Sequence, residues 1–135
     1  MKTIEQRIEF GGVTPEDLFE MYVDPRKHAK AIGAPVTISR DAGSTFAAFG
    51  EQMVRGRNLL VAARSRVVQT WRAQSWRDTD PDSIVVLTFT RTAGGAAIDL
   101  VQAGVPDASY DAMNEAWHQM YWTPWRQYLQ SARVN

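Results

Sequence analysis

Apolar and polar side chains alternate over the first ten residues of the chain. Ile4, Ile8 and Phe10 share one strand parity, while charged residues take the other. This period of two predicts a half-buried strand over residues 3–10. Apolar residues then recur at steps of three and four over residues 18–23, which predicts a short amphipathic helix.

Start and stop signals frame two short helices. Thr14 and Asp24 are good N-cap residues, and the proline that follows each one suits the first helical position. Gly33 can end the second helix, because glycine adopts the left-handed conformation found after a last turn. We therefore expect a bent pair of helices, the first ending near residue 23 and the second at Ile32.

From Pro35 onward the period returns to two. Six runs of strand-forming residues are separated by short turns rich in glycine and aspartate. The runs cover residues 36–39, 44–50, 53–62, 65–73, 83–91 and 96–104. Because short turns join consecutive strands, the strands must pair as an antiparallel meander.

The last segment predicts a long helix over residues 109–132. Its apolar residues recur at three- and four-residue steps. They are Tyr110, Met113, Trp117, Met120, Tyr121, Trp125, Tyr128 and Leu129. Asp107 or Ser109 can cap its start. Pro124 cannot donate a hydrogen bond to the carbonyl of Met120, so we expect a kink at the proline.

Composition narrows the class of protein. The chain has 135 residues, 44% hydrophobic and 22% charged, which predicts one globular domain over residues 1–135. It has no cysteine, which excludes disulfides, thiolate nucleophiles and cysteine-ligated zinc. The N-terminal residues lack the apolar run of a signal peptide, and no stretch reaches the length of a membrane span. We therefore expect a cytoplasmic protein without a membrane partner.

Fifteen basic and fifteen acidic side chains give zero net charge, but the arginines are clustered. Those between residues 52 and 77 are Arg55, Arg57, Arg64, Arg66, Arg72 and Arg77, with no acid among them. Such a cluster can bind phosphate. However, three of these positions, 64, 66 and 72, share one strand parity, which is typical of the wet side of a sheet. We expect a solvated face and no nucleic-acid binding. The acids available as partners are Glu16, Asp17, Glu20 and Asp24.

Three short motifs follow one another along the predicted strands. Gly56 lies in one strand, Thr70 and Trp71 end the next, and a later strand ends in the turn Gly104-Val105-Pro106. With the order of elements, these motifs resemble the branch of the START-like (SRPBCC) superfamily named for the activator of the heat-shock-protein ATPase, the AHSA-type domain. The resemblance covers nearly the whole chain. It implies an α+β helix-grip (START/Bet v-like) fold, in which a curved seven-stranded antiparallel sheet grips the C-terminal helix.

Two positions depart from the pattern of that branch. The second short helix reads HAKAIGAP where the branch often has a tryptophan, and Gln102 stands where it often has a histidine. The chaperone-activating members also carry an additional N-terminal domain that has no counterpart here. We therefore do not expect activation of the heat-shock ATPase to carry over from the family name.

The resemblance implies an apolar cavity between the sheet and the long helix. In related proteins such a cavity holds small hydrophobic molecules or is used for cyclase-type chemistry. The expected ligand-binding residues are Val67, Gln69, Trp71, Leu87, Phe89, Leu100 and Gln102 of the sheet and Met113, Trp117, Met120 and Tyr121 of the helix. We expect no metal and no cofactor.

Individual residues leave alternatives open. Trp71 is either core or cavity wall, since its parity points it toward the helix. The inward amides of Gln69 and Gln102 either bond to the protein or orient a ligand. His118 is expected at the surface or the edge of the helix stripe, and His28, between two lysines, is expected to face solvent.

Three functions are therefore compared. The first is a non-enzymatic protein that binds a small hydrophobic molecule. The second is a cyclase- or dehydratase-type enzyme, in which His118, Tyr121 or a glutamine moves protons. The third is a protein-interaction module, similar to a co-chaperone, that uses the outer sheet face or the aromatic end of the last helix, where Trp122 lies off the apolar stripe. A homodimer is compatible with each of them.

Overall fold

The strands form a single antiparallel sheet in the computed structural model, which describes residues 1–50 and 53–134. Within these residues the sheet has seven strands in the order β1-β7-β6-β5-β4-β3-β2. They are β1 (Lys2–Gly11), β2 (Val36–Thr37), β3 (Thr45–Ala48), β4 (Val54–Ala62), β5 (Arg66–Ala73), β6 (Ser83–Arg91) and β7 (Gly95–Val105). The predicted meander is confirmed, and β1 closes it by pairing with β7.

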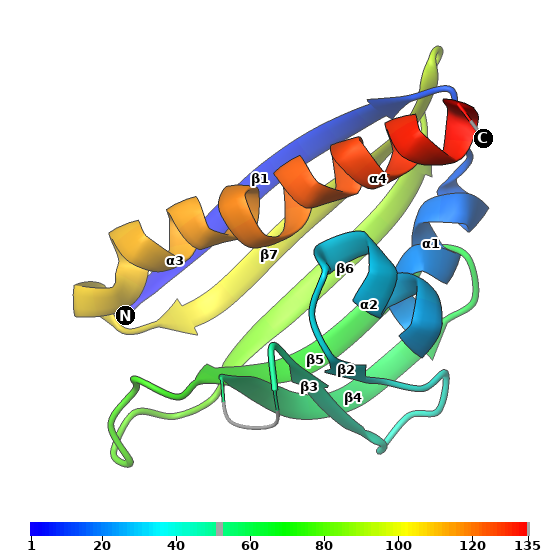
Figure 1. The fold of residues 1–135 in the computed structure, drawn as a ribbon. Coiled ribbons are helices and arrows are strands. Elements are labelled where there is room, and N and C mark those ends of the chain that lie inside the picture. The colour runs from blue at the N-terminus through cyan, green and yellow to red at the C-terminus, as the bar shows by residue number, and fades with distance from the viewer. Residues whose placement is uncertain (51–52, 135) are drawn as a thin grey trace.

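The helices α1 (Pro15–Val23) and α2 (Pro25–Ile32) connect β1 to β2 (Figure 1). Thr14 caps α1 reciprocally, because its hydroxyl accepts from the Asp17 amide and the Asp17 carboxylate accepts from the Thr14 amide, each at 3.0 Å. The Asp24 carboxylate accepts from two amides of α2. Gly33 ends α2 at a φ of 69°, so the predicted signals are confirmed.

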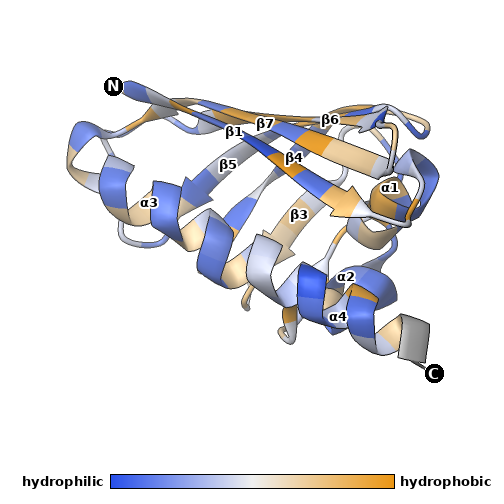
Figure 2. Cartoon of the chain, turned by 90° about the horizontal axis from the view of Figure 1, so that it is seen from above, coloured by the Kyte–Doolittle hydropathy of each residue, from blue (hydrophilic) through white to orange (hydrophobic). Residues whose placement is uncertain are grey.

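The C-terminal helix crosses the same face of the sheet that α1 and α2 cover, and the opposite face stays free of helices (Figure 2). It begins with a 3-10 turn, η1 (Asp107–Ser109), and continues as α3 (Tyr110–Trp117). A π-helical turn, η2 (His118–Trp122), then leads into α4 (Thr123–Val134). The helix-grip fold expected from the sequence is confirmed.

The predicted kink at Pro124 is replaced by the π-helical turn that precedes it. The Thr123 amide donates to the carbonyl of His118, five residues back, and Pro124 lies in the first turn of α4. Widening the preceding turn accommodates a residue that lacks an N–H and whose ring crowds the carbonyl four residues earlier. The predicted caps at Asp107 and Ser109 are wrong, since neither side chain makes a capping hydrogen bond. The Asp107 carboxylate instead pairs with the N-terminal ammonium at 2.8 Å.

Strand parity places the side chains as predicted, with one exception among the arginines. Arg66 and Arg72 lie on the outer face, opposite the buried Trp71. Arg64 lies in the turn before β5 with a positive φ of 68°, so it belongs to neither face. The acids expected to pair with the clustered arginines do not do so. Arg72 pairs with Asp82, and Arg77 pairs with Asp80. Glu20 and Glu16 pair instead with Arg40 and Arg91, which lie outside the cluster.

Candidate functional site

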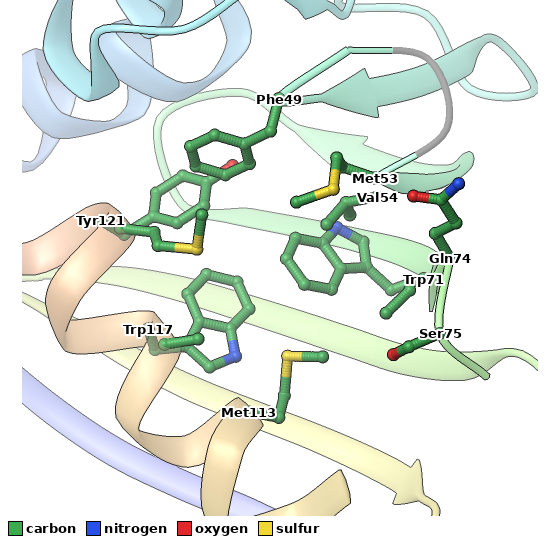
Figure 3. Close-up of a pocket in the computed structure, with 12 residues that line it drawn as sticks. Phe49, Met53, Val54, Trp71, Gln74, Ser75, Met113, Trp117 and Tyr121 are labelled. Carbon is green, nitrogen blue, oxygen red and sulfur yellow. The ribbon is translucent and has the colours of Figure 1, made fainter.

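A pocket of about 220 Å³ opens between the C-terminal helix and the sheet (Figure 3). The end of β5 and the start of β4, with the turns beside them, form one wall, and α3 with η2 forms the other. The lining residues are Phe49, Met53, Val54, Trp71, Ala73, Gln74, Ser75, Met113, Ala116, Trp117, Met120 and Tyr121. Most of them are apolar, and the exposed Gln74 and Ser75 supply polar groups on the solvent side.

Two tryptophans from opposite walls meet in the pocket. The rings of Trp71 and Trp117 stack with centroids 4.8 Å apart and planes at 16°. Phe46 extends the stack behind Trp71, and Trp122 extends it behind Trp117. Stacked aromatic pairs contribute about 0.5–1.5 kcal/mol each beyond their buried area. The aromatic surface of the pocket is therefore held in place by contacts within the protein.

Gln102 fixes the orientation of the Trp117 indole. The indole N–H donates to Gln102 Oε1 at 2.8 Å, and Gln102 Nε2 donates to the hydroxyl of Ser83 at 3.0 Å. That hydroxyl donates in turn to the carbonyl of Trp71 at 2.8 Å. The amide of Gln102 is thus satisfied inside the protein and positions the wall of the pocket.

A second buried chain joins α1 to the sheet through Gln69. The Tyr22 hydroxyl donates to Gln69 Oε1 at 2.7 Å, and Gln69 Nε2 donates to Asn58 Oδ1 at 2.8 Å. Asn58 Nδ2 donates in turn to the carbonyl of Ser39 at 2.9 Å. Burial raises the pKa of Tyr22, so its hydroxyl stays neutral. Gln69 therefore serves the packing of α1 on the sheet.

Tyr121 is held by a buried histidine. His28 Nδ1 lies 2.7 Å from the carbonyl of Tyr22, and its Nε2 lies 2.9 Å from the Tyr121 hydroxyl. A carbonyl can only accept, so Nδ1 carries the proton and Nε2 accepts from Tyr121. Burial lowers the pKa of His28 to about 4 and raises the pKa of Tyr121. The pair is neutral near pH 7, and the Tyr121 hydroxyl points toward α2.

The prediction of a solvent-facing His28 is wrong, because its side chain is fully buried. The flanking lysines suggested an exposed position, yet residues one and two steps away on a helix point to other faces. His28, Ala31 and Ile32 form the buried side of α2. Their spacing of three and four residues is the signal that identifies the inward side of this helix.

The prediction that Trp122 lies off the apolar stripe is also wrong. Its side chain is 2% exposed, and its indole N–H donates to Gln6 Oε1 on β1 at 2.7 Å. The extra residue in the π-helical turn lets Trp122 face the sheet together with Tyr121. An interaction surface at this aromatic position is therefore not available. His118 is exposed, as predicted.

The structure separates the expected ligand-binding residues into two groups. Those that line the pocket are Trp71, Met113, Trp117, Met120 and Tyr121. Those that are buried outside it are Val67, Gln69, Leu87, Phe89, Leu100 and Gln102. Helix α1 covers part of the helical face of the sheet, where the ring of Phe19 packs edge-on against the ring of Phe89 with centroids 5.8 Å apart. The room for a ligand is thus displaced toward the turns beside β4 and β5.

Several lining residues come from segments that strand parity does not describe. Phe49 follows β3 with a positive φ of 59°, and its ring packs edge-on against Tyr121 at 6.0 Å. Gln74 and Ser75 follow β5. Met53 precedes β4, and its side chain is 46% exposed. The runs 44–50 and 53–62 predict strand positions for Phe49 and Met53, but both residues lie outside β3 and β4. Their place in the pocket therefore depends on how the chain closes over the helix.

The lining offers little acid–base chemistry. Among the lining residues that the structure describes, Tyr121 is the only titratable one, and its hydroxyl is engaged by His28. In the described ranges no cluster of histidine, aspartate and glutamate could hold a metal ion. The helices within the same ranges are too short or too polar to cross a membrane. The pocket is suited to contact with an apolar molecule.

Comparisons with known proteins agree on one family. The model of the family described as "Activator of Hsp90 ATPase homolog 1-like protein" matches residues 12–130. A Dictyostelium discoideum protein named activator of 90 kDa heat shock protein ATPase homolog is 26% identical over 117 residues. The match covers 86% of this chain and 30% of that protein, so the chain spans less than a third of its relative.

Solved structures share the fold at low sequence identity. A structure described as an HSP90 activator from Plasmodium falciparum has a TM-score of 0.80 at 17% identity, covering 96% of this chain and 95% of the other. A protein from Mesorhizobium loti has a TM-score of 0.81 at 18% identity, covering 96% and 98% of the two chains. At this identity the likeness supports the architecture alone.

Proposed function

Because the chain belongs to the family of activator of Hsp90 ATPase homolog 1-like proteins, a branch of the START-like superfamily, we propose that it binds a small hydrophobic molecule as a single domain. The proposal rests on one observation. An open pocket of about 220 Å³ is lined by two buried tryptophans that stack on each other, one from the sheet and one from the long helix. Fixed apolar walls with a few polar groups at one side are typical of ligand sites.

The size of the pocket favours a compact ligand. A dry cavity of about 150 Å³ is large enough for benzene in other proteins, so this pocket has room for one or two rings. The flexible thioethers of Met53, Met113 and Met120 can adapt to its outline. A polar end of the ligand would reach Gln74 and Ser75, while its rings contact Trp71 and Trp117.

The same geometry supports binding over catalysis of the cyclase or dehydratase type. A general acid or base must lie within hydrogen-bond reach of the reacting group. The Tyr121 hydroxyl donates to His28, and the exposed His118 is not among the lining residues. Gln69 and Gln102 are both committed to protein partners.

Ligand binding is tested by native mass spectrometry and by titration of tryptophan fluorescence. The titrants are naphthols, two-ring aromatic ketones and fatty acids. We expect saturable quenching by at least one aromatic titrant, which Trp71→Phe reduces. The matched control is Trp76→Phe, since Trp76 is also buried but does not line the pocket. Absence of saturable binding in the whole panel, with the mass of the bare chain, would overturn the proposal.

A second candidate function is contact with a heat-shock ATPase. Family membership favours it, because the family model described as "Activator of Hsp90 ATPase homolog 1-like protein" matches residues 12–130. The match to the Dictyostelium discoideum protein spans a minor part of that protein, so its activity as a whole is not transferred. The test is the steady-state ATPase rate of purified Hsp90 with and without this protein. An unchanged rate together with no complex in sedimentation would exclude this function.

A further inference from the structure

The outer face of the sheet carries aliphatic side chains where alternation predicts polar ones. Leu60, Val68, Val86 and Val101 form directly paired neighbours across β4, β5, β6 and β7. Ile84 and Ala103 pair beside them in the adjacent row. We call these residues the aliphatic patch: Leu60, Val68, Ile84, Val86, Val101 and Ala103. Each of them is partly or fully exposed, and Leu60 and Val101 are 46% and 36% exposed.

A β-bulge adds to the patch. The register between β4 and β5 shifts between Asn58 and Leu60. Asn58, before the shift, points inward as Val54 does, while Leu60, after it, pairs with the outward Val68. Leu59 and Leu60 are 47% and 46% exposed. Regular alternation would place the side chains of two consecutive leucines on opposite faces. The bulge therefore turns a second large apolar side chain to solvent beside the patch.

On the described part of this face, unpaired basic residues lie on one side of the aliphatic patch and unpaired acidic residues lie on the other. Arg57 and Arg66 lie on the β4–β5 side and form no ion pair with any carboxylate that the structure describes. Glu5 and Glu9 lie on β1 and equally lack a cationic partner within the described residues. Arg7, between the two glutamates, pairs with Asp99 of β7 at 2.7 Å. The unpaired charges are thus basic on one side of the face and acidic on the other, with apolar residues between them.

We propose that this face binds a second copy of the chain in a two-fold symmetric dimer. A two-fold axis that runs along β6, between the two facing sheets, places β7 of one copy over β5 of the other and β1 over β4. Val101 then meets Val68 of the second copy, and Val86 meets its own counterpart. Asp99, which pairs with Arg7 of its own copy, comes opposite Arg66. Glu5 comes opposite Leu60, one row from Arg57. When the two copies face each other, apolar residues meet apolar residues and charges of opposite sign meet, as an isologous interface requires.

The distribution of charge on the outer sheet face indicates which partner binds there. A nucleic acid or another polyanion would be attracted by the arginines but repelled by the glutamates on the same face. A second copy satisfies both sides and covers the patch in between. The pocket lies on the opposite face of the sheet, so the dimer and the ligand site are independent.

The test is sedimentation equilibrium of the full chain at concentrations on the order of 1–100 μM. This hundredfold range distinguishes a dimer with a Kd in the μM range from a weaker one. We expect a monomer–dimer equilibrium, and we expect Val86→Lys to raise its Kd by more than about a hundredfold, because two like charges would meet on the axis. The matched control is Gln119→Lys, an exposed position on the helical side, which should leave the Kd unchanged.

Charge reversal distinguishes this interface from any other. Glu5→Arg and Arg57→Glu should each weaken the dimer, and the double variant should recover most of the lost affinity. Circular dichroism checks that each variant is folded, and the fluorescence titration checks that the pocket is intact. A wild-type chain that stays monomeric, or a dimer indifferent to Val86→Lys, would overturn the proposal while leaving the ligand-binding function untouched.

Discussion

His28 Nε2 accepts a hydrogen bond from the Tyr121 hydroxyl across 2.9 Å, and this contact ties α2 to the π-helical turn of the C-terminal helix. The ring of Tyr121 lines the pocket, while its hydroxyl reaches behind the pocket wall. The same histidine donates to the carbonyl of Tyr22 at the end of α1. One neutral imidazole therefore holds together the short helices and the pocket-facing side of the long helix.

The stability of the fold should depend on pH through His28. Burial lowers the pKa of His28 from 6.5 to about 4, so the unfolded chain binds more protons than the folded chain between these values. Stability is therefore lost as the pH falls from 6.5 toward 4, by about 3 kcal/mol. Urea unfolding between pH 4.5 and 7.5 measures this, and we expect His28→Gln to flatten the dependence. His118→Gln is the control and should keep the wild-type slope; an equal slope in both variants would contradict the assignment.

Removing the Tyr121 hydroxyl should destabilise the protein. Tyr121→Phe leaves the buried Nε2 of His28 without a donor, which costs about 1–3 kcal/mol. The matched control is Tyr128→Phe, because the partly exposed Tyr128 hydroxyl has no hydrogen-bond partner among the described residues. Chemical denaturation of the two variants provides the comparison. Equal stabilities would show that the hydrogen bond contributes nothing.

Filling the pocket should abolish ligand binding without unfolding the chain. Ala116 lines the pocket on α3, and Ala116→Leu adds apolar volume there. We expect at least about a tenfold loss of affinity for the best aromatic titrant, with stability unchanged or raised by about 0.5–2 kcal/mol. Ala112→Leu, at an exposed position of the same helix, should bind normally. A ligand that binds Ala116→Leu as it binds the wild type occupies another site.

Gly56 is required by the close approach of two strands. A Cβ at this position would lie 1.7 Å from the carbonyl oxygen of Thr70, so the backbone of β4 or β5 would have to move. We expect Gly56→Ala to cost at least about 2 kcal/mol, because overpacking against backbone cannot relax through a rotamer change. Gly94→Ala is the control, since a Cβ there meets nothing within 4 Å. Thermal unfolding compares the two, and a Gly56→Ala protein as stable as Gly94→Ala would refute the argument.

The elements of the fold could be predicted because each has a local cause. The strands follow from alternation, and the capped starts of α1 and α2 follow from Thr14 and Asp24 with their prolines. The antiparallel order follows from the short turns. Even the inward direction of Gln69 and Gln102 was given by parity. Such features depend on residues that are close in sequence.

The site was predicted in part, because its shape depends on long-range packing. Parity identified Trp71 as inward, but it could not show that Leu87 and Phe89 lie in the part of the sheet interior that is filled by side chains. Phe49 enters the pocket from a backbone conformation that is uncommon for a residue with a Cβ. The buried position of His28 follows from the helical period of α2 and not from the charge of its sequence neighbours.

The π-helical turn gives the long helix two separately phased halves. The half before it presents Met113 and Trp117 to the pocket, and the half after it presents Trp125 to the core. In a helix of uniform pitch, the direction in which one half presents its side chains would fix the direction for the other half. The extra residue between them sets the direction of the first half, and with it the pocket wall, apart from the direction of the second half, which packs in the core. The turn thus separates the part of the helix that shapes the pocket from the part that anchors the helix in the core.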